Sequence, residues 1–467
     1  MTQYISTRGT DETRTGFTDV LLNGLAPDGG LYIPDSWPEL DRTTLARMAG
    51  TPYADIAYQV MLPFLNGELP PAVFKRILTD VYQQQFNHSC VAPLVQVGPN
   101  AWIMELFHGP TLAFKDYALQ LLGQLFDYVL EQRGERATIV GATSGDTGSA
   151  AIEACRHCKH IDIFILHPKG RTSEVQRRQM TTIEAPNVFN IALEGTFDDC
   201  QSLVKAMFGD KKFNKDMNLS AVNSINWARI MAQVVYYISA ALALGAPERS
   251  VSFAVPTGNF GNIYAAYVAR RMGIPIQRLI IGSNRNDILT RFFETGVMKA
   301  NEVEPSLSPS MDIQISSNFE RYLCDLLGRD TASIAKLMKS FKDKGTFMIG
   351  DEYMRKARKE FDARRCNDAE TTQMMAACYK ETGYLIDPHT AVGLFSGWQV
   401  KEDPAVPLVA LACAHPAKFP DAVEKATGIR PPLPEHLADL YDRPEFVTPL
   451  PNDLKKVQQF IKDKANR

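Results

Sequence analysis

The chain has 467 residues, of which 45% are hydrophobic and 22% are charged, and its formal net charge is −3. This length is too great for one ordinary hydrophobic core, so we expect roughly two to four compact regions. The nearly balanced charge gives no sign of nucleic acid or membrane as a partner, and the composition is typical of soluble globular proteins.

Residues 1–92 are predicted to form an N-terminal helical region. A turn-rich segment around residues 26–40 is followed by apolar residues at helical spacing in 53–65 and again in 71–86. We expect these helices to form a layer that covers the region behind them.

From residue 93 to residue 300, short β-rich runs alternate with segments of helical periodicity. The strand candidates are 137–141, 161–166, 251–255 and 278–282. Such alternation is typical of a mostly parallel sheet covered by helices, and it predicts an α/β core over 93–300.

The segment 301–311, NEVEPSLSPSM, is rich in turn-forming residues and interrupts this alternation. Three helical patterns follow it, so residues 301–384 are predicted to be an inserted helical subdomain. A strand candidate at 407–412 returns the chain to the α/β core over 385–429. Residues 430–467 are predicted to be a C-terminal tail that ends in a lysine-rich helix.

Three features favour a cytoplasmic protein. The eight cysteines follow no framework spacing, which indicates reduced thiols rather than disulfides. The first residues carry charged side chains and lack the apolar core of a signal peptide. The longest apolar run, 230–246, contains Gln233 and is short for a bilayer, so we expect a buried helix there.

Lys115 stands at an unusual place in the chain. It follows the turn-rich apolar segment FHGPTLAF and opens a segment with apolar residues at helical spacing. The helix dipole disfavours a cation at a helix start, whereas an amine that must be partly neutral benefits from that position. The pattern suggests a Schiff-base lysine, although a solvated lysine at the start of an amphipathic helix explains it as well.

Two glycine-rich loops each follow a β-rich run and precede a helical run. They are GATSGDTGSA at 141–150 and PTGNFGNIY at 256–264. Such a loop directs backbone N–H groups and a helix N-terminus at one spot, which forms an anion site. Neither loop is a Walker A or a complete GxGxxG sequence, which argues against a nucleotide. A lysine together with a phosphate site instead predicts pyridoxal 5'-phosphate, held by an imine at one end and by its phosphate at the other.

Segments spread over almost the whole chain resemble the threonine synthases of the bacterial and fungal type. In chain order they are STRG, DGGLYIP, HGPTLAFKD, ATSGDTGSAA, PKGRTSEVQRRQMTT, NSINWARI, PTGNFGN, SSNFERYL, DPHTAVG and AHPAKF. The resemblance implies the pyridoxal-phosphate fold type II, which is tryptophan synthase β-like and has two α/β lobes built on parallel sheets.

The resemblance also implies a cofactor site. Lys115 would form the imine and would act as the proton-transferring catalytic residue once the substrate amine has displaced it. The cofactor phosphate would be bound by Gly258, Asn259, Phe260, Gly261 and Asn262. A tight turn that needs glycine for a positive φ is the alternative reading of this loop. Cys413 would face the pyridine nitrogen, where many relatives carry threonine or serine, or it is simply a buried filler.

The substrate-binding candidates fall into two groups. The loop residues Thr143, Ser144, Asp146 and Thr147 would bind the substrate α-carboxylate, with helix capping as the alternative for Ser144, Asp146 and Thr147. Candidates for the substrate phosphate are Lys169, Arg171, Asn223, Ser224, Asn226 and Arg229, because guanidinium, amide and hydroxyl groups suit phosphate oxygens. Arg178 and Arg321 are alternatives for that role.

Other polar residues are expected to be structural. The run CRHCKH at 155–160 lacks a second ligand pair at metal spacing, so no metal site is expected. His108, His389 and His415 are given no role in proton transfer, and Asp116 is expected to favour the helix start.

The reaction implied is the conversion of O-phospho-L-homoserine and water to L-threonine and phosphate, a pyridoxal-phosphate-dependent β,γ-replacement that ends threonine biosynthesis. We expect a monomer or homodimer without nucleic-acid or membrane partners. A lyase or dehydratase of the same fold, acting on hydroxy- or phospho-amino acids, is the first alternative. A non-catalytic metabolite-binding relative is the second, and the intact Lys115, Asp146 and glycine loops argue against it.

Overall fold

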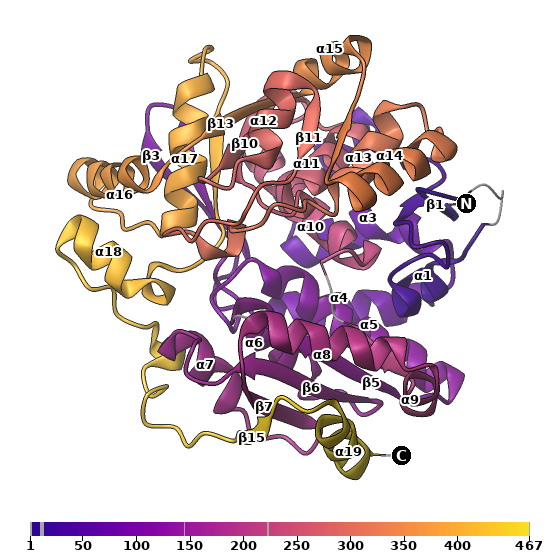
Figure 1. Ribbon diagram of the computed structural model, residues 1–467. Coiled ribbons are helices and arrows are strands. Elements are labelled where there is room, and N and C mark those ends of the chain that lie inside the picture. Colours follow the sequence, from indigo (N-terminus) through magenta and orange to yellow (C-terminus); the bar gives the residue numbers. More distant parts are fainter. Residues whose placement is uncertain (1, 10–13, 144, 222–223, 467) are drawn as a thin grey trace. The chain divides into compact units, whose positions relative to one another are not determined.

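The computed structural model describes residues 2–9, 14–143, 145–221 and 224–466 (Figure 1). Two stretches of chain, Met1–His108 and Ser224–Pro431, form one compact unit, called unit 1 here. The stretches Gly109–Asn223 and Pro432–Arg467 form the other, called unit 2.

Unit 1 is built on a six-stranded sheet in the order β13-β10-β9-β14-β4-β3. Its strands are β3 (Leu94–Gly98), β4 (Ala101–Glu105), β9 (Val251–Pro256), β10 (Ile276–Ser283), β13 (Phe361–Arg365) and β14 (Leu408–Ala412). All neighbouring strands are parallel except β3 and β4. The central strands β9 and β14 are buried throughout, as expected for a parallel sheet that helices cover on both faces.

Helices cover both faces of this sheet. On one face, α16 (Asp368–Thr382) and α17 (Pro388–Val400) share a core with the strands, which includes Ala254, Leu394 and Ala410. The largely buried helix α10 (Trp227–Ala243) packs beside α11 (Gly261–Arg271), and the ring of Tyr237 on α10 lies 4.9 Å from that of Phe253 on β9. The apolar run that was read as a buried helix is thus α10.

Unit 1 also contains further helices. They are α1 (Phe17–Asn23), α2 (Arg42–Met48), α3 (Tyr53–Met61), α4 (Pro71–Gln84), α12 (Ile288–Thr295), α13 (Phe319–Leu326), α14 (Thr331–Lys344), α15 (Asp351–Glu360) and α18 (Pro420–Thr427). Short 3₁₀ turns are η1 (Leu62–Leu65), η2 (Pro309–Met311) and η3 (Pro416–Lys418). Two small antiparallel pairs join β1 (Tyr4–Ser6) to β2 (Tyr32–Pro34) and β11 (Val297–Lys299) to β12 (Thr346–Met348).

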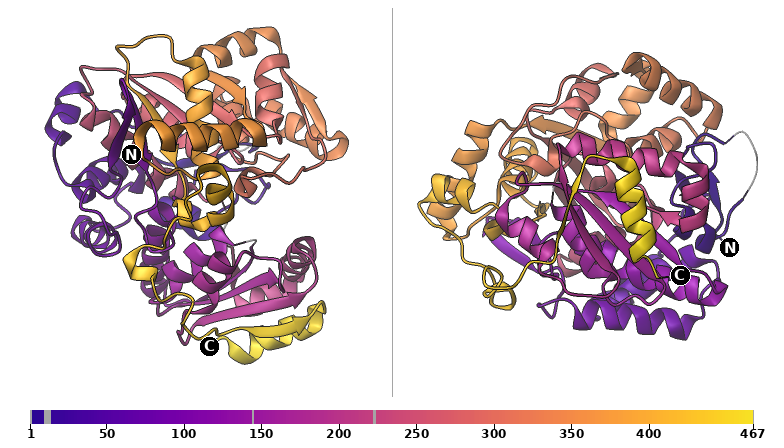
Figure 2. Two further views of the ribbon diagram at one scale, coloured as in Figure 1. Left: turned by 90° about the vertical axis from the view of Figure 1, so that its left-hand side faces the viewer. Right: turned by 60° about the horizontal axis from the view of Figure 1, so that its bottom comes forward.

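Unit 2 is built on a five-stranded parallel sheet in the order β15-β7-β6-β5-β8. Its strands are β5 (Ala137–Ala142), β6 (Ile161–Pro168), β7 (Val188–Glu194), β8 (Leu219–Ser220) and β15 (Thr448–Pro451). Its helices are α5 (Lys115–Arg133), α6 (Asp146–Cys155), α7 (Glu174–Thr181), α8 (Phe197–Gly209), α9 (Lys211–Met217) and α19 (Leu454–Lys464), with the turn η4 (Glu435–Leu437). Figure 2 shows α19 lying along this sheet.

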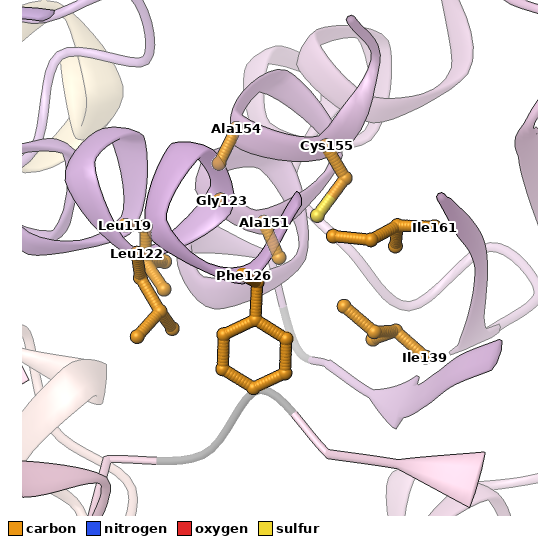
Figure 3. Close-up of a pocket in the computed structure, with 9 residues that line it drawn as sticks. All are labelled: Leu119, Leu122, Gly123, Phe126, Ile139, Ala151, Ala154, Cys155 and Ile161. Atoms are coloured by element: carbon orange, nitrogen blue, oxygen red, sulfur yellow. The ribbon is translucent and has the colours of Figure 1, made fainter. Parts of the chain in front are cut away.

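The two faces of the unit 2 sheet are covered by different helices. Val140, Phe164 and Ile191 share a core with α8, α9 and α19. Ile139 and Ile161 face α5 and α6 instead, around an apolar cavity of about 10 Å³ (Figure 3). This alternation along the strands follows from the two-residue period of side chains in a β-strand.

Helices α5 and α6 approach each other closely at Gly123. A Cβ added at Gly123 would lie 2.5 Å from the carbonyl oxygen of Ala154 on α6, so only glycine fits there (Figure 3). Gly123 and Ala154 are each eight residues from the start of their helices, which begin at Lys115 and Asp146. The contact therefore lies about 12 Å along both helices and holds their first residues at the same level.

The predicted strands correspond to β5, β6, β9, β10 and β14, and the predicted helices at 53–65, 71–86 and in the tail correspond to α3 with η1, α4 and α19. The three helical patterns after residue 311 are α13, α14 and α15. Strands β3, β4, β7, β13 and β15 were not predicted. The predicted domain boundaries stay a proposal. Among the described residues, no helix combines the length and the apolar character needed to cross a bilayer.

Candidate functional site

Lys115 is the first residue of α5, as the sequence predicted, and the loop before it is fixed by Asp116. The fully buried Asp116 carboxylate accepts the backbone N–H of Thr111 at 2.8 Å and its hydroxyl at 2.6 Å. A Cβ at Gly109 would lie 2.5 Å from the Asp116 carboxylate, so this contact requires glycine. Asp116 therefore fixes the loop that leads into α5, and its effect on the helix start stays a prediction.

The Lys115 amine lies beside a carboxylate of the first glycine loop. Its Nζ is 3.5 Å from Oδ2 of Asp146, and the two side chains are only 14% and 7% exposed. Asp146 is the first residue of α6, so each member of the pair opens a helix. A buried amine beside a fixed carboxylate is an arrangement suited to covalent and proton-transfer chemistry.

The rest of this loop is organised by Thr143. Its Oγ1 accepts the N–H groups of Gly145 at 3.0 Å and Gly148 at 2.9 Å. The N-cap of α6 is Gly145, and Asp146 and Thr147 are the first two helical residues, so the capping alternative is wrong for both. Ser144 lies outside the described residues.

Gln176 on α7 was not predicted and contacts Asp146 directly. Its Nε2 donates to Oδ1 of Asp146 at 2.8 Å, leaving Oδ2 on the side of Lys115. The two residues are 30 positions apart in the sequence, and no motif or periodic spacing connects them. Only the presence of Gln176 inside the segment PKGRTSEVQRRQMTT could have pointed to it.

Two of the phosphate candidates in unit 2 are exposed. Lys169 lies 3.8 Å from Glu194 in a surface ion pair, and Arg171 is also exposed. The alternative residue Arg178 is bonded to Glu174 at 3.1 Å and is within 3.9 Å of Glu445. These ion pairs are a sufficient account of the partly buried Arg178.

The second glycine loop, in unit 1, joins the carboxyl end of β9 to the start of α11. Phe260 is the N-cap of α11 and has a φ of 63°, whereas Gly258 and Gly261 do not have positive φ. The alternative reading, in which glycine supplies a positive φ in a tight turn, is therefore wrong. The ring of Phe260 packs on Phe319, with the ring centroids 4.9 Å apart. Only the backbone of Phe260 is therefore suited to binding a ligand at this loop.

The glycines of this loop are needed for a close approach instead. A Cβ at Gly258 would lie 3.1 Å from Cα of Met311, and one at Gly261 would lie 3.1 Å from Nδ2 of Asn318. Ser316 Oγ donates to the Gly258 carbonyl at 2.8 Å, and the Ser317 N–H donates to Asn259 Oδ1 at 2.7 Å. Asn259 also donates to Ser224. These hydrogen bonds fix the loop through side chains and a carbonyl oxygen. The first-turn N–H groups of α11, which have no acceptor within the helix, are therefore suited to binding an anion.

Asn262 is anchored by two tyrosines and faces the cysteine that the sequence singled out. Its Oδ1 accepts the hydroxyls of Tyr236 at 2.5 Å and Tyr237 at 2.7 Å, and its Nδ2 donates to Cys413 Sγ at 3.6 Å. The amide side chain is therefore used inside unit 1, and only its backbone N–H suits the phosphate. Cys413 is buried, and its role toward a pyridine nitrogen stays a prediction.

Arg229, on the first turn of α10, is a buried cation that forms no ion pair with the residues that the structure describes. Its side chain is nearly inaccessible, and its Nε and Nη1 have no hydrogen-bond partner among the residues that the structure describes. Burial lowers the pKa of Arg229 to about 10. Because an uncompensated buried charge is costly, this guanidinium is suited to binding an anion.

The other candidates around α10 are held by structural contacts. Asn226 is its N-cap: Oδ1 accepts the Ala228 N–H at 3.0 Å, and Nδ2 donates to the Leu21 carbonyl at 2.8 Å. Arg321 donates to the carbonyl oxygens of Tyr32 at 2.9 Å and Ile225 at 2.6 Å. Asn223 lies outside the described residues.

The three histidines of the family segments each have a neighbouring partner. His108 lies 2.6 Å from Glu105, His389 lies 2.7 Å from Asp387, and His415 accepts the backbone N–H of Ala417 at 3.1 Å. Within the described ranges, no group of three or more His, Cys, Asp or Glu side chains could hold a metal ion.

Three family models match the chain. The model for the threonine synthase N terminus matches residues 3–82, that for pyridoxal-phosphate dependent enzymes matches residues 91–348, and that for the threonine synthase C-terminal region matches residues 390–461. The second of these covers more than half of the chain. The chain is therefore a member of the pyridoxal-phosphate-dependent enzymes.

Comparison with individual proteins narrows this class. The threonine synthase of Pseudomonas aeruginosa is 55% identical over 466 residues, which cover 100% of this chain and 99% of that protein. The threonine synthase of Saccharomyces cerevisiae is 42% identical over 456 residues, 91% of this chain and 88% of that protein. The chain belongs to the threonine synthase family.

Solved structures give the same result. The crystal structure of threonine synthase with bound pyridoxal phosphate from Brucella melitensis has a TM-score of 0.98 at 52% identity and covers 100% of both chains. The yeast threonine synthase has a TM-score of 0.95 at 39% identity, covering 99% of this chain and 98% of that one. The fold and cofactor class predicted from the sequence are confirmed.

Proposed function

We propose that this chain converts O-phospho-L-homoserine and water to L-threonine and phosphate, the reaction of a carbon–oxygen lyase acting on a phosphate ester. The observation that carries the proposal is the buried pair of Lys115 and Asp146, 3.5 Å apart at the starts of two helices. Such a pair supplies a positioned amine whose protonation its surroundings control. Full-length similarity to threonine synthases supports the same reaction.

The residues present fit pyridoxal 5'-phosphate. In this proposal Lys115 binds the cofactor covalently through Nζ, and the N–H groups of Gly258–Asn262 and of the first turn of α11 bind its phosphate. Cys413, which accepts a hydrogen bond from Asn262, is proposed to face the pyridine nitrogen. When bound, pyridoxal phosphate supplies an electron sink for negative charge on the substrate carbon atoms.

Lys115 is assigned the proton transfers. Its amine, once displaced by the substrate amine, takes protons from the substrate carbon atoms and returns them. Asp146 holds the ammonium form while the amine carries a proton. Because like charges repel, we now assign Asp146 to the lysine rather than to the substrate α-carboxylate.

The substrate α-carboxylate is assigned to the start of α6. Thr143 and Thr147 offer hydroxyl groups there, and the helix N-terminus favours an anion. Ser144 is proposed for the same role. The structural basis is the loop that Thr143 holds in place.

Arg229 is proposed as the main ligand of the substrate phosphate. Its buried Nε and Nη1 have no hydrogen-bond partner among the described residues, and phosphate is the anion that this substrate brings. Lys169, Arg171, Asn223 and Asn226 stay secondary proposals. The exposure of Lys169 and Arg171 makes their contribution smaller, because exposed charges are screened.

Arg229→Gln tests this assignment. We expect the KM for O-phosphohomoserine to rise roughly 30-fold or more, because charged hydrogen-bond pairs contribute about 2 kcal/mol or more when desolvated. Arg249→Gln is the control, since Arg249 is an exposed arginine bonded to Asn100 at 2.9 Å. An unchanged KM in Arg229→Gln would remove Arg229 from the phosphate site.

A lyase or dehydratase of the same fold remains the alternative. It would keep Lys115 and both glycine loops, and it would release phosphate or water from phosphothreonine, serine or threonine instead. Product analysis with each substrate separates the two. We further propose a cytoplasmic location, supported by the lack of disulfides among the cysteines of the described chain, and a monomer or homodimer.

A further inference from the structure

We propose that Gln176 is a positioning residue for the catalytic pair: its amide holds Asp146 so that the second carboxylate oxygen faces Lys115 and keeps the free amine protonated. The inference rests on the proposed function, because that function gives Lys115 its role. It adds a residue of α7 to a site otherwise formed by the starts of α5 and α6.

The orientation of the Gln176 amide is fixed from its other end. Ser173, the N-cap of α7, accepts the Gln176 backbone N–H at 3.4 Å and donates its hydroxyl to Gln176 Oε1 at 2.8 Å. Because Oε1 is used by this hydroxyl, the NH₂ group of the amide is the end that reaches Asp146. Nε2 donates to Asp146 Oδ1 at 2.8 Å.

In the glycine loop before α6, the backbone at Gly145 passes close to the Gln176 side chain. Gly145 has a φ of 149°, and a Cβ there would lie 2.6 Å from Cδ and Oε1 of Gln176. A side chain at residue 145 would therefore displace the amide from Asp146. The glycine is needed at this position both for its backbone conformation and for the room that it leaves.

The hydrogen bond from Gln176 favours the ionised form of Asp146. An amide NH₂ can only donate, so it stabilises the carboxylate rather than the carboxylic acid. The ionised Oδ2, 3.5 Å from Lys115 Nζ, then favours the ammonium form of the lysine. Of the other carboxylates nearby, Asp116 is bonded to Thr111 and Glu153 is paired with Arg156 at 2.9 Å.

The test is the pH at which half of Lys115 reacts with acetic anhydride in the full chain without cofactor, measured by mass spectrometry of the Lys115 peptide. In Gln176→Met, which removes the donor at similar volume, we expect this midpoint to fall by about one pH unit, a tenfold change in the protonation equilibrium. The control is Gln179→Met, because Gln179 lies on the same helix and donates to the Thr111 carbonyl at 3.2 Å without bonding Asp146. Its midpoint should match that of the wild type.

A double-mutant comparison keeps the proposal falsifiable if Gln176→Met is unstable. Asp146→Asn alone should lower the midpoint, and adding Gln176→Met to it should lower it no further, because both changes remove one interaction. An unchanged midpoint in a folded Gln176→Met variant, or an equal fall in Gln179→Met, would overturn the proposal. The proposed function fails separately, if the wild type makes no threonine while the midpoints behave as expected.

Discussion

At Lys115, two electrostatic effects act in opposite directions. The positive end of the α5 dipole disfavours the ammonium by about 0.3–1 kcal/mol at a helix start. A carboxylate 3.5 Å away attracts it with about 5 kcal/mol if the effective dielectric constant is near 20, before the cost of burial is counted. The attraction of Asp146 for the ammonium is therefore several times larger than the effect of the helix dipole at this position.

The site could be predicted from the sequence only where a residue belongs to a local pattern. Lys115 was found because a lysine at a helix start is unusual, and the loop 258–262 because glycines follow a strand. Gln176 and the tyrosines behind Asn262 were missed, since their contacts join residues 25 to 30 positions apart. The positive φ fell on Phe260 because its ring is held in the core, which offsets the cost of the left-handed conformation.

The hydrogen bonds of two tyrosines to Asn262 should contribute measurably to the stability of the fold. Tyr237→Phe removes one of two hydroxyl donors to Oδ1, so we expect the free energy of unfolding to fall by about 1 kcal/mol. Asn262→Leu leaves both hydroxyls without this acceptor and should cost about 2–4 kcal/mol. Urea denaturation of the two variants measures the difference. Equal losses would mean that the tyrosines find other acceptors.

At the scale of elements, strands were predicted where apolar runs are continuous and missed where polar residues or proline interrupt them. β7, VFNIALE, contains Asn190, whose side chain is used to bond the Met180 carbonyl at 3.0 Å. β15 contains two prolines, which a strand tolerates because β15 lies at the edge of its sheet. β13, FDARR, is likewise an edge strand and shows no apolar run. For β13 and β15 the position at the sheet edge was decisive, and the sequence alone does not reveal that position.

Gly123→Ala tests whether the contact between α5 and α6 positions Lys115 and Asp146 relative to each other. The added methyl would overlap the Ala154 carbonyl, so we expect a loss of about 1–3 kcal/mol in stability and a fall in activity, because the helix starts carry Lys115 and Asp146. Gly209→Ala is the matched control. Gly209 ends α8 with no atom within 4 Å of an added Cβ, so alanine should leave activity unchanged and stabilise slightly. Full activity in Gly123→Ala would show that the pair does not depend on this contact.

At the scale of the whole molecule, each unit has its own parallel sheet and its own core. The chain leaves unit 1 after His108, returns to it at Ser224 and leaves again after Pro431. Unit 2 contains Lys115 and Asp146, and unit 1 contains the loop 258–262 and Arg229. The α/β class of the core was predictable because it depends on alternating elements, whereas the course of the chain between the units was not.

The acid stability of the molecule should depend on Glu105, the last residue of β4. Burial raises the pKa of this carboxyl, but hydrogen bonds from His108 at 2.6 Å and from Tyr384 outweigh it, and the net pKa lies below the ordinary 4.5. A carboxyl with a lowered folded pKa stabilises the fold above its unfolded pKa and loses this contribution as pH falls through the folded pKa. Glu105→Gln should therefore be about 1–3 kcal/mol less stable than wild type at pH 7.

The difference between these two proteins should shrink as pH falls from about 5 toward 3, since the wild-type carboxyl is then protonated. Denaturant unfolding at several pH values measures it. A difference that stays constant down to pH 3 would mean that the Glu105 charge contributes nothing to the stability.

The most direct test of the central claim is the visible absorbance of the purified protein saturated with pyridoxal phosphate, followed by threonine and phosphate release on adding O-phosphohomoserine, in wild type and in Lys115→Ala. We expect a visible band and equal amounts of threonine and phosphate in the wild type, and neither the band nor the products in the variant. A band with phosphate but no threonine would favour the lyase reading. A band and threonine formation that both survive Lys115→Ala would contradict the role assigned to Lys115.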